Sequence, residues 1–159
     1  MTDSALTAIE RFASSHNLNG HTESRSTIEE FNAECGGIIP EWYCEILSRH
    51  PICGVELEWP DPDDSDDFIG VEWMSIRNMR SEMLDCYPGL AIHSAGYICI
   101  AGCTTGSGDQ YYICCKDGDD PPVYQVYHDV SDVADEILAK GRSIVFAKLS
   151  DLFKVARVA

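Results

Sequence analysis

The sequence is poor in basic residues and has no long apolar run. Among 159 residues, 11 are Lys or Arg and 27 are Asp or Glu, which gives a formal net charge of −16 at pH 7. Nucleic acids and anionic membranes both attract positive patches, so this charge balance argues against either as a partner. A membrane-spanning helix needs roughly 18 or more consecutive apolar residues, and no run of that length occurs. We therefore expect a soluble protein.

Secretory and disulfide signatures are missing as well. The first residues, MTDSALTAIERF, carry an acidic side chain at position 3 and lack the apolar centre of a secretory signal. The eight cysteines include no Cys-x-x-Cys pair and lack the close spacing of a disulfide-stapled scaffold. We expect a cytoplasmic protein with free thiols and no cofactor. A zinc site formed by Cys99, Cys103 and Cys114 across neighbouring strands is the alternative that we weighed.

The glycine-rich stretch CTTGSGDQYYICC, residues 103–115, contains no lysine. A phosphate-binding Walker loop needs Gly-x-x-x-x-Gly-Lys-Ser/Thr, because its backbone N–H groups hold the phosphates while the lysine neutralises them. Two glycines between β-rich runs are instead typical of a hairpin, since glycine readily adopts positive φ angles. The stretch is predicted to form a hairpin tip rather than a nucleotide site.

A dense acidic run occupies residues 61–67 and is followed by Glu72. It partly resembles a calcium loop, in which oxygen ligands alternate and a glutamate stands at the twelfth position. The sixth position should be glycine but is Asp66, and Pro60 and Pro62 disrupt an entering helix. We interpret the run as a solvated acidic turn that is able to contact a partner.

Catalytic motifs are equally sparse. The five histidines are widely separated, and none has the His-Glu-x-x-His spacing of a metalloprotease. Nucleophilic catalysis would require a cysteine beside a base, and His93 or His128 could meet Cys99 or Cys114 across strands. Because no compact motif supports this, we do not expect an enzyme. A small hydrolase is kept as a less favoured alternative.

The residue pattern predicts a helical N-terminal part and a strand-rich centre. An apolar periodicity predicts a helix near the N-terminus, a polar linker extends to residue 25, and two helices follow between Ser26 and Gly36 and between Pro40 and His50. The capping-box form Ser-x-x-Glu at residues 26–29 marks the first of these two helices. Two strands, ICGVELEW and FIGVEWMSI, flank the acidic turn, and a helix is expected over residues 77–86. Three strands, GYICIAGC, QYYICCK and PVYQVYHD, precede two closing helices around residues 133–138 and 149–155.

Several of these stretches resemble the SUKH superfamily, which includes the Smi/Knr cell-wall-assembly regulators. STIEEFNAECGGIIPEWYCEIL is similar to the family's N-terminal helix pair, with Ile39-Pro40-Glu41-Trp42-Tyr43 as its Leu/Ile-Pro-x-x-Tyr element. GYICIAGCTTGSGDQYYICCKDGDDPPVYQVYHD is similar to the central strands, and KLSDLF to the closing helix. The sequence departs from the family at residues 48–51, where an Asn-Gly pair is common, and in its additional N-terminal helix.

The resemblance implies a single α+β domain over residues 26–159, with a mainly antiparallel sheet flanked by helices, preceded by an N-terminal helix and linker over residues 1–25. It also implies binding rather than catalysis, because bacterial members typically neutralise toxins, many of them nucleases. A nuclease presents positive charge to its substrate, so the expected partner is a cognate toxin with a basic surface. A regulator or scaffold of the fungal type is the alternative. The expected contacts are acidic: Asp61, Asp63, Asp64, Asp66, Asp67, Asp117, Asp119 and Asp120.

Overall fold

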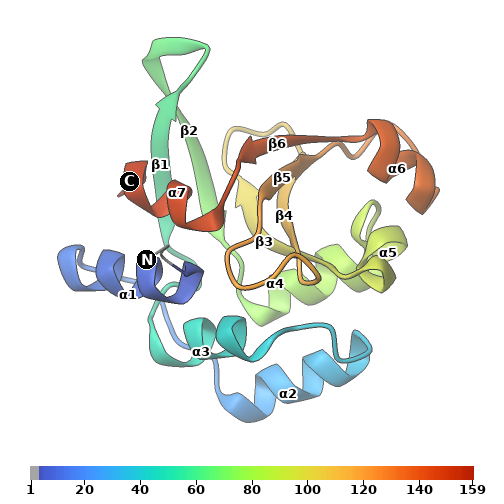
Figure 1. Ribbon diagram of the computed structural model, residues 1–159, viewed down its shortest axis with the longest axis horizontal. Helices are drawn as coiled ribbons and strands as arrows, with labels where there is room; N and C mark the ends of the chain where they lie inside the picture. Colours follow the sequence, from blue (N-terminus) through green and yellow to red (C-terminus); the bar gives the residue numbers. More distant parts are fainter. Residues whose placement is uncertain (1–3) are drawn as a thin grey trace.

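The structure, a computed structural model, describes residues 4–159 as an α+β fold in which one antiparallel sheet is flanked by helices (Figure 1). This confirms the predicted fold class. The helices are α1 (Ala5–Ser15), α2 (Arg25–Glu34), α3 (Glu41–Arg49), α4 (Ile76–Arg80), the π-helix η1 (Ser81–Asp85), α5 (Gly89–Ile92), the 3₁₀ helix η2 (His93–Ala95), α6 (Ala134–Lys140) and α7 (Leu149–Val155). The strands are β1 (Glu56–Asp61), β2 (Asp64–Trp73), β3 (Tyr97–Cys103), β4 (Gln110–Cys114), β5 (Val123–Val126), β6 (Arg142–Phe146) and β7 (Arg157–Val158).

The seven strands follow the order β6-β5-β4-β3-β2-β1-β7, and each neighbouring pair is antiparallel. The two outermost strands are joined by the short connection that contains α7. Seven strands spaced about 4.8 Å apart would place the outer two roughly 29 Å apart in a flat sheet. A connection of one two-turn helix and a few extended residues spans only about 25 Å. The sheet therefore has to curl, and the rings of Trp59 in β1 and Phe146 in β6 come within 5.3 Å of each other.

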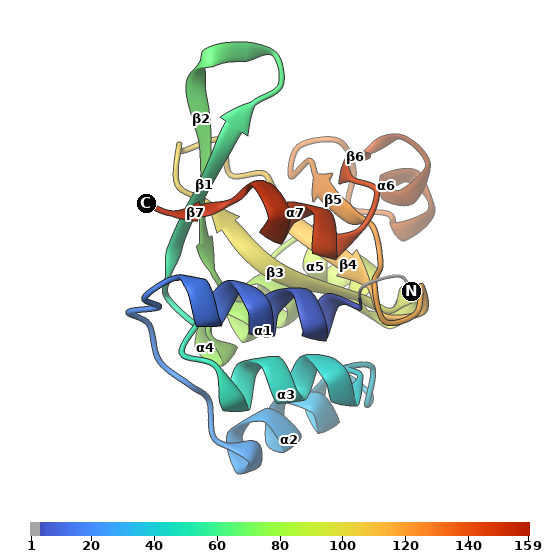
Figure 2. The same ribbon diagram turned by 60° about the vertical axis from the view of Figure 1, so that its left-hand side comes forward.

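The N-terminal helices form a stack below the curled sheet. Figure 2 shows α1 between the sheet side and α3, with α2 beyond α3, and α1 packs against both α3 and α7. Phe12 of α1 joins these parts, because its ring lies 5.3 Å from that of Phe153 in α7, and the Phe153 ring lies 5.4 Å from that of Trp73 in β2. All three side chains belong to the single buried core. Within residues 4–159, no helix is both long and apolar enough to cross a membrane.

Two helix boundaries differ from the sequence prediction. Helix α2 begins after Ser24, whose hydroxyl oxygen accepts a hydrogen bond from the backbone N–H of Thr27 at 3.2 Å, rather than at the Ser-x-x-Glu box formed by residues 26–29. Ser24 is an equally good N-cap residue, and the earlier start adds two residues, Arg25 and Ser26, to the helix. The helix expected over residues 77–86 begins at Ile76, after the N-cap Ser75, and widens into a π-helix from Ser81.

The acidic run is also not simply a turn. Strand β1 continues to Asp61 and β2 begins at Asp64, so only Pro62 and Asp63 connect the two strands. Aspartate is disfavoured in strands, but the pairing of Trp59 with Ile69 and of Pro60 with Phe68 extends the ladder from the buried part of the sheet into solvent. The predicted acidic turn is therefore the end of a long hairpin.

Candidate partner-binding surface

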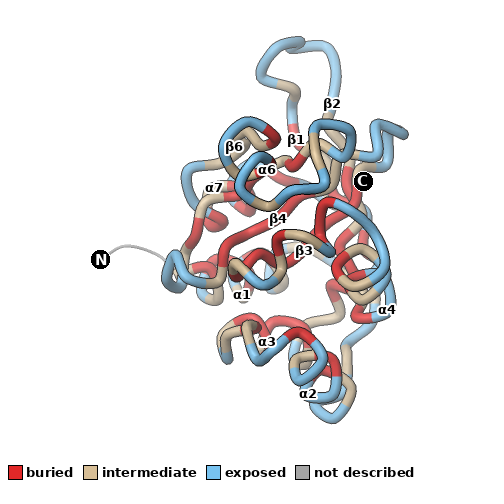
Figure 3. Tube along the Cα trace, turned by 90° about the vertical axis from the view of Figure 1, so that its right-hand side faces the viewer, coloured by how far each residue is buried: buried red, intermediate tan, exposed pale blue. Residues whose placement is uncertain are grey.

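The most prominent surface feature is the end of the β1–β2 hairpin, residues 60–68, here named the acidic arm. Figure 1 shows it projecting beyond the rest of the sheet, and Figure 3 shows it largely in the colour of exposed residues. Its carboxylates include four on exposed residues, whereas Asp61 is half-buried. Five acidic side chains in seven positions give this projection a concentrated negative charge. The structure brings together five of the predicted contact residues: Asp61, Asp63, Asp64, Asp66 and Asp67.

Local hydrogen bonds give the acidic arm a defined shape. The Oδ1 atoms of Asp61 and Asp64 accept hydrogen bonds from the backbone N–H groups two residues ahead, at 2.8 and 3.1 Å. Asp67 accepts from the N–H of Phe68 at 2.8 Å. Such side-chain to backbone bonds are typical of aspartate in turns, and they leave the second carboxylate oxygen of each residue available for other contacts.

A basic residue near the C-terminal end of the chain braces the base of the acidic arm. Arg157 of β7 donates from Nε to Oε1 of Glu58 at 2.8 Å, and its guanidinium carbon lies 4.3 Å from the ring centroid of Phe68. A guanidinium over an aromatic face is attracted by the ring quadrupole. Arg157 therefore holds side chains of both strands of the hairpin in one contact.

Two recesses adjoin the acidic arm, and residues of the arm line both of them. The first, here named the apolar recess, has a volume of about 260 Å³ and is lined by Trp59, Pro60, Pro62, Val145, Phe146 and Val155. The second, the polar recess, has a volume of about 270 Å³ and is lined by Asp61, Asp67, Phe68, Ile69, Cys103, Thr105, Ser107, Tyr111 and Gln125. The rings of Phe146 and Tyr111 contact the Trp59 indole edge-on at 5.3 and 5.8 Å. The arm thus places negative charge directly beside an apolar depression.

A larger recess of about 330 Å³ lies at the base of the hairpin, where Glu56 and Glu72 face each other across β1 and β2. Its lining also includes Asn78 and Thr104. These two glutamates point to the opposite side of the sheet from Leu57 and Val71, which are buried. We do not place the main binding site there, because the free end of the acidic arm and the apolar recess lie elsewhere on the hairpin.

The loop between β3 and β4 borders the polar recess and confirms the predicted hairpin tip. Gly106 and Gly108 have φ angles of +85° and +76°, which side chains disfavour. Asp109 closes the loop, because its Oδ1 accepts hydrogen bonds from the backbone N–H of His128 at 3.0 Å and lies 2.6 Å from the ring Nδ1. The hydrogen bond to Asp109 raises the pKa of His128; desolvation opposes this shift, and the negative charges of Asp109 and Asp129 add to it.

Cys103 is the one thiol in this region whose environment favours the thiolate. Partial burial, the largest effect, raises its pKa, but hydrogen bonds from Ser107 and Thr105 outweigh this, so the pKa lies below the ordinary value. The Thr105 hydroxyl is 2.9 Å from the sulfur. By contrast, burial raises the pKa of the Tyr111 phenol to about 12, so this hydroxyl keeps its proton. The polar recess therefore offers one polarised thiol and one neutral phenol.

The remaining predicted contact residues lie elsewhere. The acidic arm precedes the part of β2 that pairs with β3, whereas Asp117, Asp119 and Asp120 follow β4. Because β2, β3 and β4 alternate in direction, the two acidic segments lie at opposite ends of the sheet. Asp120 also has a structural role. Its carboxylate accepts from the backbone N–H and the hydroxyl of Ser150 in α7, at 2.8 and 2.6 Å. The structure therefore does not bring the eight predicted aspartates onto one face.

The suggested cysteine clusters do not form. Cys99 is fully buried, burial raises its pKa well above the ordinary value, and its sulfur contacts the carbonyl oxygen of Ala101. Cys114 contacts the carbonyl oxygen of Ala95. Within residues 4–159, the groups of possible metal ligands that converge do not include Cys99, Cys103 and Cys114 together. The histidines proposed as bases bond elsewhere, His93 to the carbonyl oxygen of Gly89 and His128 to Asp109. These contacts provide no support for the hydrolase alternative.

The curled antiparallel sheet and the stacked helices define an α+β fold, and the acidic arm gives it a projecting, negatively charged surface. The chain matches the profile of the SMI1 / KNR4 family (SUKH-1) over residues 23–153, and it therefore belongs to this family. The resemblance found in the sequence is confirmed. No match was found among curated proteins or among solved structures.

Proposed function

We propose that this protein is a non-enzymatic binding domain that neutralises a cognate toxin by covering a basic surface of that toxin, with nucleases as the favoured toxin class. Membership of the SUKH-1 family supports binding rather than catalysis. The formal charge of −16 supports a basic partner. The observation that carries the proposal is the acidic arm, which projects beyond the rest of the sheet and adjoins the apolar recess.

The two parts of this surface act at different ranges. The carboxylates of the acidic arm attract a basic partner before contact, and such steering raises association rates by roughly 10- to 1,000-fold at low salt. The apolar recess acts only at contact, where an inserted aromatic or aliphatic side chain is desolvated and slows dissociation. Charge on the arm should therefore control the association rate, and the recess the dissociation rate.

The test is to search beside the gene for the toxin domain that the proposal requires, to co-express the two proteins, and to measure binding kinetics at two salt concentrations. In the first variant, Asp63, Asp64, Asp66 and Asp67 are all changed to asparagine, which keeps the Oδ1 acceptors of Asp64 and Asp67. We expect the association rate to fall roughly tenfold at low salt. The difference should shrink once the ionic strength reduces the screening length to about 8 Å. The second variant, Val155→Ser, should raise the dissociation rate and leave association unchanged.

The matched control removes four negative charges that lie outside the acidic arm. Glu29 and Glu30 on α2 become glutamine, and on α6 Asp135 becomes asparagine and Glu136 becomes glutamine. All four residues are exposed, and Figure 1 shows both helices away from the acidic arm. If the control slows association as much as the arm variant does, overall charge rather than the arm is responsible, and the proposed surface is wrong. Failure to protect cells against the neighbouring toxin would refute the immunity function. Binding of a basic partner that is not a toxin would favour the regulator or scaffold alternative.

A further inference from the structure

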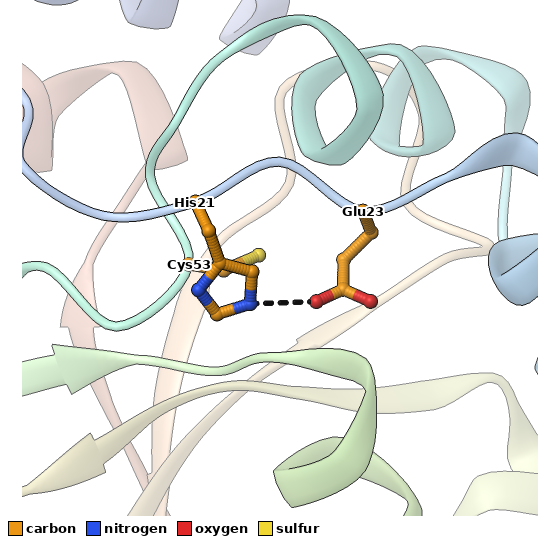
Figure 4. A group of neighbouring side chains, drawn as sticks. All are labelled: His21, Glu23 and Cys53. Carbon is orange, nitrogen blue, oxygen red and sulfur yellow. Dashed lines mark hydrogen bonds and ion pairs between the residues drawn. The ribbon is translucent and has the colours of Figure 1, made fainter.

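Three side chains with metal-binding atoms meet at the junction between the N-terminal linker and the loop after α3. They are His21, Glu23 and Cys53, whose ligand atoms all lie within 4.8 Å of one another (Figure 4). The imidazole Nε2 of His21 is 2.8 Å from Oε1 of Glu23. None of the three residues belongs to the acidic arm or to either recess beside it.

The backbone explains why these side chains converge. His21 and Cys53 form an isolated antiparallel bridge, in which each N–H donates to the other residue's carbonyl oxygen, at 3.0 and 3.2 Å. Directly opposed residues of such a pair project their side chains to the same side. Glu23 lies two residues further along the extended segment and so points the same way, and its N–H donates to the carbonyl oxygen of Leu47 at 2.8 Å. The three donors are therefore held by backbone contacts that are independent of the side chains.

We propose that His21, Glu23 and Cys53 form a binding site for a divalent transition metal, and specifically for Zn²⁺. An imidazole nitrogen, a carboxylate oxygen and a thiolate sulfur are the three ligand types that Zn²⁺ uses in proteins, whereas Ca²⁺ and Mg²⁺ favour oxygen ligands throughout. Ligands of a tetrahedral zinc ion are roughly 3.3–3.6 Å apart for bonds of 2.0–2.3 Å. Side-chain rotations that move the ligand atoms by a few tenths of an ångström to about 1 Å would bring the three residues to that geometry.

Burial is graded across the site in a way that suits a bound ion. Cys53 is fully buried, the Glu23 side chain is 13% exposed and the His21 side chain is 56% exposed. Solvent can therefore reach the ion from the His21 side and supply water as the fourth ligand. Burial raises the pKa of the Cys53 thiol to about 12, so the bound metal has to displace the thiol proton. Binding is consequently expected to release a proton and to strengthen as the pH rises.

A bound ion would connect two segments that are far apart in the sequence. His21 and Glu23 lie in the linker between α1 and α2, and Cys53 lies between α3 and β1. The ion would thus fasten the linker to the base of the hairpin that carries the acidic arm. A second group of possible ligands, Asp109, His128 and Asp129, is more exposed and has no sulfur, which allows the two groups to be distinguished by spectroscopy.

The experiment uses the full chain, reduced and freed of metal with a chelator, then titrated with Zn²⁺ by calorimetry and with Co²⁺ by absorption spectroscopy. We expect one Zn²⁺ per chain, release of protons, and a thiolate-to-Co²⁺ charge-transfer band that is lost in Cys53→Ala. His21→Ala changes an exposed side chain and should weaken Zn²⁺ binding by more than tenfold. Loss of an outer-shell partner already costs about tenfold or more in affinity, and His21 is proposed as a direct ligand.

Two matched variants control for loss of a histidine and of a buried cysteine. His128→Ala and Cys44→Ala should leave the Zn²⁺ affinity and the Co²⁺ band unchanged. The proposal is overturned if Zn²⁺ does not bind, if the Co²⁺ spectrum lacks the thiolate band, or if His128→Ala abolishes binding while His21→Ala does not. Because His21→Ala leaves the buried core intact, circular dichroism of this variant should show that lost affinity does not reflect unfolding.

Discussion

Truncation of Phe12 in α1 tests whether the N-terminal helix belongs to the cooperative fold. The Phe12 side chain is 3% exposed, its ring stacks on His16 at 4.0 Å, and it meets the edge of Phe153 in α7 at 5.3 Å. Phe12→Ala removes a ring from the packed core and leaves a cavity between α1 and α7. Comparable substitutions in other cores cost about 3–5 kcal/mol.

The expected shift is large enough to measure directly. For a domain of 150–250 residues, each kcal/mol lowers the melting temperature by about 2–4 °C, so Phe12→Ala should lower it by roughly 6–20 °C. Urea denaturation followed by circular dichroism should show a lower midpoint and an unchanged m-value, because the whole chain still unfolds as one unit. The double variant with Phe153→Ala should cost about 0.5–1.5 kcal/mol less than the sum of the single changes, since the two rings contact each other.

The control is Val155→Ala on α7, where the side chain is 51% exposed. This change should alter the free energy of unfolding by no more than about 0.5 kcal/mol. If Phe12→Ala costs less than about 1 kcal/mol, or if a separate early transition appears, α1 is an appendage to the domain rather than part of its core. In that case the contact between the Phe12 and Phe153 rings contributes little to stability.

Three further predictions concern the loop between β3 and β4. Alkylation of Cys103 followed over a range of pH by mass spectrometry should show a pKa below the ordinary thiol value, and Ser107→Ala should raise it because a hydrogen bond to the sulfur is lost; an unchanged pKa would contradict the assignment. In NMR titrations, Asp109→Asn should lower the pKa of His128. Because the pKa of His128 is raised in the folded state, the pair stabilises the fold fully below the unfolded-state pKa of about 6.5. This stabilisation is lost as the pH rises through the folded-state pKa. Equal His128 titration in the wild type and in Asp109→Asn would refute the pairing. Gly108→Ala should destabilise by about 1–2 kcal/mol in thermal melts, because φ is +76° and the new Cβ would lie 3.3 Å from the His128 ring; a neutral result would show that the loop relaxes.

The central strands could be predicted because their signals are local. β3, β4 and β5 are apolar runs separated by short segments rich in glycine, aspartate or proline, and this pattern is sufficient to place a hairpin. Strand β6 was missed, since its five residues follow Gly141 directly and none of its side chains is fully buried. The two-residue strand β7 is too short to leave any periodicity in the sequence.

The acidic arm shows where sequence-based reasoning reaches its limit. Its aspartates correctly indicated an exposed segment, but strand propensity predicted a turn, because the interactions that extend the hairpin are not local. Arg157 contacts Glu58 and Phe68 from the far end of the chain. The His21, Glu23 and Cys53 group was missed for the same reason. Only His21-x-Glu23 is visible as a spacing, and Cys53 joins it through a backbone bridge that no residue pattern records.

Residues 142–158 supply both edge strands of the sheet, which affects the order in which the other strands become protected during folding. Until this segment docks, β1 and β5 are the outer strands of any sheet already formed. Neighbouring partly folded chains would repel one another at β1, where the aspartates of the hairpin act as gatekeepers against edge-to-edge pairing. Strand β5, with Val123, Tyr124 and Val126, has no comparable charge, and it is therefore the edge at which premature association between chains would begin.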